Sequence, residues 1–78
     1  MMNKEEFIQL LQEKKYKTAQ NILSEMNDID TAAFLEELDA KECALAFRLI
    51  SKEKAADVFS CMNSKMQTFL VDMFRKLN

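Results

Sequence analysis

The chain has 78 residues, 49% of them hydrophobic, and its 13 acidic and 11 basic side chains give a formal net charge of −2. That length suits one domain with a modest core, so residues 1–78 are expected to form a single helical-repeat domain. Because Gly and Pro are both absent, sheet-based folds and Gly-rich phosphate-binding loops are disfavoured, and an all-α fold is expected.

The distribution of charge and hydropathy also limits the classes of binding partner that are expected. Basic residues are spread along the chain and form no general basic patch, so no nucleic-acid partner is expected. No apolar run approaches the roughly 18 residues of a membrane span, so no direct membrane insertion is expected.

The chain has two cysteines, Cys43 and Cys61, and no His, which are too few ligands for a zinc site. With no secretory leader in front of them, reduced thiols, a cytoplasmic location and a core position for both are expected.

The sequence repeats on a frame of twelve residues. Places eight and nine of every block are apolar, and place twelve is apolar in five of the six blocks. That spacing lies on one stripe of a helix, so each block predicts a short helix of about two and a half turns with one buried side. Five of the six opening residues favour helix N-caps; the blocks open at Asn3, Lys15, Asn27, Asp39, Ser51 and Asn63.

The six predicted helices follow one another along the chain. Blocks 3–14 and 15–26 carry their apolar pairs at 10–11 and 22–23, and block 27–38 carries its pair at 34–35. Block 39–50 opens with Asp39 and Glu42 at the spacing of a capping box. Block 51–62 has its apolar pair at 58–59. Block 63–74 has two competing starts, Asn63 and Ser64, and the second forms a possible capping box with Gln67.

Helices this short are unstable alone and must stack on each other. The expected fold is therefore a right-handed superhelix, or α-solenoid, of about six short helices that contact mainly their sequence neighbours. Small residues at place six, Ala32, Ala44 and Ala56, would let adjacent helices approach closely. The alternative is a compact bundle of fewer, longer helices made by fusing neighbouring blocks.

The stretch from Glu25 to Glu42 is locally acidic, with seven acids against the single base Lys41. Its ordinary interpretation is a solvated helix face. The alternative is a surface that attracts a cation or a basic partner, for which the candidate residues are Glu36, Glu37, Asp39 and Glu42. An enzyme is not expected, because the chain has no His and no nucleophile motif.

The middle of the chain resembles a known family. Residues 34–38 read FLEEL and residues 46–60 read AFRLISKEKAADVFS. These segments are similar to the LLEEL, LFRLLPKE and AAEVFS segments of the cytoplasmic N-terminal domain of MgtE-type magnesium transporters, and the similarity covers about residues 20–74. Ser51 stands where the family has a proline, and the family's later helices, with further acids, have no counterpart before residue 78.

The resemblance implies a role in magnesium sensing. In that family the domain is a superhelix of short helices joined to CBS domains and a magnesium channel in the membrane, and Mg²⁺ held between the N-terminal and CBS domains favours the closed channel. The family's acid falls on Asp57, which the resemblance makes a candidate interdomain Mg²⁺ ligand. Taken alone, Asp57 would read as a solvated helix acid. The implied partners are the CBS domains or the channel domain of the same transporter.

A second hypothesis is a stand-alone protein-interaction module without a metal role, similar in its short helices to the repeat of the flagellar rotor protein FliG. Such a module would use Met side chains, which adapt to a partner surface. Met26 and Met62 lie on the predicted buried stripe and are expected in the core. Met66 and Met73 lie off it and fit either a core or a contact position.

Overall fold

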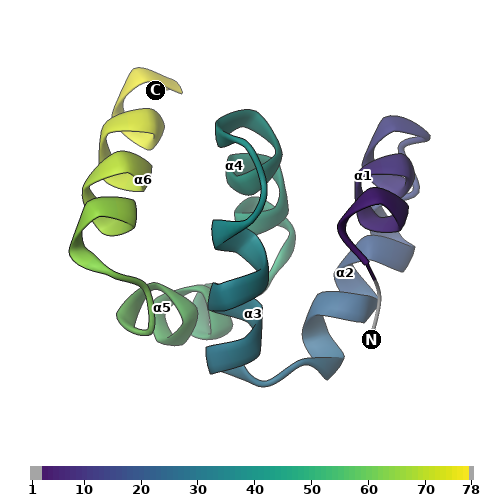
Figure 1. Ribbon diagram of the computed structural model, residues 1–78, viewed down its shortest axis with the longest axis horizontal. Helices are drawn as coiled ribbons and strands as arrows, with labels where there is room; N and C mark the ends of the chain where they lie inside the picture. Colours follow the sequence, from purple (N-terminus) through teal and green to yellow (C-terminus); the bar gives the residue numbers. More distant parts are fainter. Residues whose placement is uncertain (1–2, 78) are drawn as a thin grey trace.

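The computed structural model describes residues 3–77, so residues 1, 2 and 78 of the predicted domain lie outside the described residues. Within that range the chain is all-helical, as predicted, with six helices and no strand. Fusion of neighbouring blocks into fewer, longer helices is wrong, because a break separates each block from the next. The helices are α1 (Lys4–Gln12), α2 (Tyr16–Glu25), α3 (Asp28–Glu36), α4 (Ala40–Leu49), α5 (Lys52–Ser60) and α6 (Ser64–Leu77) (Figure 1).

Most helices start with the side-chain cap that the frame predicts. Asn3, Asn27, Asp39 and Ser51 each accept a hydrogen bond from the backbone N–H three residues ahead. This bond satisfies one of the donors that the first helical turn leaves exposed. Lys15, the one block opening without a capping side chain, makes no such bond.

The start of α6 decides between the two competing caps. Asn63 Oδ1 accepts from the N–H of Met66 at 2.8 Å, so Asn63 is the capping residue. The predicted capping box of Ser64 and Gln67 is therefore wrong. The Gln67 amide instead donates to the Phe59 carbonyl at 2.7 Å, which caps the end of α5.

Packing joins alternate helices as well as some sequence neighbours. The principal packed pairs are α1 with α2, α2 with α4, α3 with α4, α3 with α5, and α4 with α6. In Figure 1 the first two helices lie at one end, α6 lies at the other, and α3 and α4 lie between them. The expectation of contacts mainly between sequence neighbours is therefore too narrow, because alternate helices also share faces.

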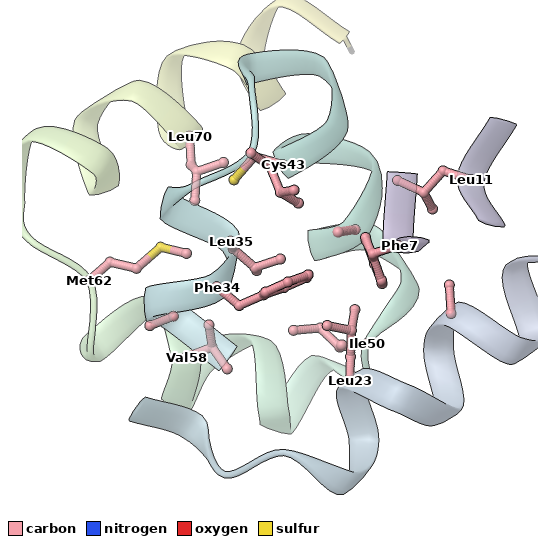
Figure 2. Close-up of a cluster of buried hydrophobic side chains, with 14 residues drawn as sticks. Phe7, Leu11, Leu23, Phe34, Leu35, Cys43, Ile50, Val58, Met62 and Leu70 are labelled. Atoms are coloured by element: carbon pink, nitrogen blue, oxygen red, sulfur yellow. The ribbon is translucent and has the colours of Figure 1, made fainter. Parts of the chain in front are cut away.

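One hydrophobic cluster draws side chains from all six helices (Figure 2). At its centre the Phe7 and Phe34 rings meet edge to face, with centroids 5.1 Å apart. Phe47 of α4 packs on Phe74 of α6 with ring centroids 5.7 Å apart. The cluster therefore ties the first helix to the third and the fourth to the sixth.

Place five of the frame is buried in the first four blocks, whereas place six was expected to carry the close approaches. Phe7, Ala19, Thr31 and Cys43 occupy place five of the first four blocks and are all buried. Ala32 and Ala44 at place six are buried as predicted, but Ala56 is exposed. Places five, eight, nine and twelve form a wider stripe than three places alone, because residues i and i+4 share a helix face.

Candidate functional site

The four acids of the predicted interaction surface have separate environments. Glu36 is half-buried near the end of α3, and its Oε2 accepts from the Asn63 N–H at 3.3 Å. Glu37 is exposed and lines a hollow between α1 and α3. Asp39 Oδ1 accepts from the Glu42 N–H at 2.9 Å. The structure thus brings Asp39 and Glu42 together as a helix cap and does not gather all four around one point.

Asp57 is exposed on α5, one residue before the buried Val58. Among the described residues, its carboxylate takes part in no hydrogen bond or ion pair. No group of three or more acidic, Cys or His side chains within residues 3–77 could hold a metal ion. Asp57 thus offers one exposed carboxylate, and Mg²⁺ is commonly held in proteins by one or two carboxylates and several waters.

Two hollows lie between α4 and α6 and meet at Ala40, which lines both. We call them together the α4–α6 groove. The first, of about 410 Å³, is lined on the α6 side by Lys65, Met66 and Phe69. The second, of about 420 Å³, lies between Met73 of α6 and the Lys41–Arg48 side of α4. Two of the four Met residues weighed in the sequence, Met66 and Met73, therefore line this groove.

The floor of the groove is part of the core. Leu70 of α6 is fully buried and points toward Cys43 of α4 (Figure 2). Burial, reinforced by the nearby charge of Glu36, raises the pKa of the Cys43 thiol to about 11. Cys43 is therefore an unreactive core thiol, as predicted. Cys61 is exposed at the end of α5, so its predicted core position is wrong.

The expected core positions of Met26 and Met62 are confirmed, since Met62 is buried and Met26 packs half-buried against the cluster. Sequence reasoning missed Phe69 and Lys65 as groove residues. The available signal was on α6 itself, where Met66, Phe69 and Met73 follow an i, i+3, i+7 spacing that defines a second apolar stripe beside the frame.

The six helices define a small all-α domain whose distinguishing features lie on its surface. These features are exposed acids and an apolar groove, and the described range contains no metal-binding cluster. The chain belongs to the family of the MgtE intracellular N domain, whose model matches residues 26–76, more than half of the sequence. No curated protein and no solved structure gives a significant match.

The family match confirms the resemblance found in the sequence. The matched range contains the FLEEL segment, the 46–60 segment and Asp57. The chain is therefore a magnesium-transporter N-terminal domain. The family to which it belongs consists of transporter domains and is not a known family of enzymes. Within residues 3–77, no helix is long and apolar enough to cross a bilayer.

Proposed function

We propose that this domain regulates a magnesium transporter from the cytosolic face of the membrane, sensing Mg²⁺ and acting on the channel through contact with CBS domains. The observation that carries the proposal is the family match over residues 26–76, which includes Asp57. In this proposal the domain performs no catalysis. It changes the channel by binding a second domain when Mg²⁺ is abundant.

The fold proposed for this role is one continuous domain over residues 1–78, built as a right-handed superhelix. The support is the order of packing, in which α2 contacts α4, α3 contacts α5 and α4 contacts α6. Alternate helices that share faces in this way produce a stack with two side surfaces. One such surface would carry Asp57 toward the CBS domains.

Asp57 would supply one carboxylate to a Mg²⁺ ion shared between the two domains. Its side chain is exposed, so a second surface can approach without unfolding α5. Mg²⁺ loses its waters reluctantly and binds carboxylate oxygen while keeping several of them. A carboxylate from each domain would therefore suffice to join the two surfaces, and removal of the ion would leave two acids facing each other. In the same proposal, Glu36, Glu37, Asp39 and Glu42 would form an acidic interaction surface of this domain.

A magnesium titration followed by backbone amide NMR at constant ionic strength tests the Asp57 site. Millimolar Mg²⁺ is expected to shift the amides next to Asp57 in the wild-type chain, and Asp57→Asn is expected to abolish these shifts. Glu53→Gln is the matched control, because Glu53 is an exposed acid on the same helix. Shifts that survive in Asp57→Asn would contradict the assignment.

The shared site is tested in a transporter that joins this domain to CBS domains and a channel. Asp57→Asn is expected to raise the Mg²⁺ concentration needed to close the channel, because one ligand of the closing ion is lost. Glu53→Gln is expected to leave that concentration unchanged. Equal Mg²⁺ dependence of closure in the wild type and Asp57→Asn would show that Asp57 holds no regulatory ion.

A further inference from the structure

The α4–α6 groove is a second candidate binding surface, separate from Asp57, since no residue of α5 lines either hollow. We propose that it binds an acidic amphipathic helix of a partner protein. This inference goes beyond the proposed magnesium function and does not depend on it.

The apolar wall of the groove is of the kind that receives helix side chains. Met66, Phe69 and Met73 share one face of α6, and Phe69 is 37% exposed. Met side chains change rotamer easily and adapt to the shape of an inserted side chain. Ala40 and Ala44 on the opposite wall are small enough to let a partner backbone approach. The groove can therefore bury apolar side chains without rearranging either helix.

The helical walls of the groove determine which backbone conformation a bound partner segment can adopt. Both walls are helices, and the N–H and C=O groups of a helix interior are already bonded within the helix. An extended peptide would find no sheet edge to pair with and would leave its own backbone groups without partners. A helix satisfies these groups internally and can anchor through side chains at i, i+3, i+4 and i+7.

The charges beside the groove determine the character of the partner. Lys41 and Arg48 line one hollow, and Lys65 and Glu36 line the other, whereas the whole chain has more acids than bases. The one acid, Glu36, accepts a hydrogen bond from the Asn63 N–H. The groove is thus a basic region of an acidic molecule, and carboxylates flanking the apolar anchors of the partner would complement it.

A displayed peptide library tests the proposal on the complete chain. The library contains 14-residue helices with Leu, Ile, Met or Phe at i, i+3, i+4 and i+7, and with either Glu or Lys at the flanking positions. Selection on the wild-type chain is expected to enrich Glu over Lys at the flanking positions at least tenfold. Absence of enrichment, or enrichment of Lys, would overturn the proposal.

Variants locate the binding. The selected Glu-rich peptides are expected to bind the double variant Lys41→Glu, Arg48→Glu at least tenfold more weakly. The double variant Lys17→Glu, Lys52→Glu changes the net charge equally at exposed positions outside the groove and is expected to keep the affinity within twofold. A melting curve for each variant checks folding. Equal affinity of both double variants would place binding elsewhere.

Phe69→Ala tests the apolar wall, and it is expected to weaken peptide binding without unfolding the chain, because Phe69 is partly exposed. The competing occupant is a second copy of this chain. Sedimentation that shows a dimer, dissociated by the Lys41→Glu, Arg48→Glu variant, together with no selected acidic peptide, would overturn the acidic-helix proposal in favour of self-association.

Discussion

Lys54 holds three helices together through one ammonium group. Its Nζ donates to the Met26 carbonyl at 2.6 Å and to Asp28 Oδ1 at 3.2 Å. The Met26 carbonyl ends α2 and Asp28 begins α3, so a positive charge from α5 lies where the dipole of α2 is negative. The Lys54 side chain is 16% exposed. A lysine within a charged segment is therefore structural, and its partners lie more than twenty residues away.

The two cysteines differ because each has a different position in its helix. Cys43 lies at place five of its block, where i and i+4 partners complete the buried stripe. Cys61 lies at the end of α5, where the chain turns toward α6. Hydrophobic character alone does not separate the two positions. Of the two, only Cys61 is exposed to solvent.

The raised pKa of the Cys43 thiol predicts a pH dependence of stability. An unfolded thiol ionises near pH 8.5, whereas folded Cys43 keeps its proton to about pH 11. Between these values the unfolded state binds fewer protons, so the free energy of unfolding falls as pH rises, by up to about 1.4 kcal/mol per pH unit. Urea unfolding at about pH 8 and about pH 10 measures this fall.

The Cys43→Ala variant provides the comparison for that measurement. It is expected to show a smaller fall than the wild type between the two pH values, whatever its absolute stability. Cys61→Ala is the matched control, because it removes the other thiol, which is exposed. Identical pH dependences in Cys43→Ala and the wild type would contradict the link between burial and titration.

At the level of elements, α1 ends in a way that the frame does not predict. Lys14 has φ 60, which is the left-handed region that favours Gly. The Lys15 N–H donates to the Leu10 carbonyl at 2.9 Å and the Lys14 N–H donates to the Leu11 carbonyl at 3.1 Å, which is the Schellman arrangement. This conformation explains why the twelfth place of the first block is Lys rather than an apolar residue, since the side chain projects into solvent.

Lys14→Gly is expected to stabilise the domain. A side chain with a Cβ costs about 1–2 kcal/mol in the left-handed conformation, and the gain from removing it is partly offset by the greater freedom of Gly in the unfolded chain. The free energy of unfolding should rise by about 0.5–1 kcal/mol, measured by urea denaturation. The same substitution inside a helix, Ala33→Gly, should lower it by about 1 kcal/mol. A loss of stability in Lys14→Gly would contradict the described turn.

At the scale of the whole molecule, burial along the ninth place of the frame decreases toward the C-terminal helices. Leu11, Leu23 and Leu35 are buried, Phe47 and Phe59 are half-buried, and Val71 is 40% exposed. The frame predicts one buried stripe for every block, and Val71 is where this prediction is wrong. In the earlier blocks, other helices cover the side chains at this place. No described helix packs over the outer face of α6, so this face is open.

Truncation of a side chain to Ala should therefore reduce stability by different amounts at the centre of the core and on the open face of α6. Leu35→Ala removes a fully buried side chain and is expected to cost about 2–5 kcal/mol. That is a large part of the stability of a domain this small. Val71→Ala is expected to cost about 0.5 kcal/mol or less. Thermal unfolding followed by far-UV circular dichroism measures both.

The same melting curves test whether residues 1–78 act as one domain. A single cooperative transition in the wild type and in both variants is expected. Two separate transitions, or equal costs for Leu35→Ala and Val71→Ala, would contradict a single core centred on α3.

The sequence alone determined where the first five helices begin, that there are six helices, and which stripe most of them bury. These features are local, because a capping side chain bonds a backbone group three residues away and the stripe repeats with the helical period. Asp39 and Ser51 show this, as their caps follow directly from residue type and spacing.

The tertiary structure decided what lies between the helices. The bond of Gln20 to the Leu49 carbonyl, the exposure of Cys61 and Val71, and the groove beside Met66 all depend on how alternate helices cross. Crossing is set by the summed packing of side chains that are distant in sequence, and a twelve-residue pattern carries no information about it. The proposed functional surfaces depend on this packing, so Asp57 was proposed from a family resemblance and the α4–α6 groove from the folded molecule.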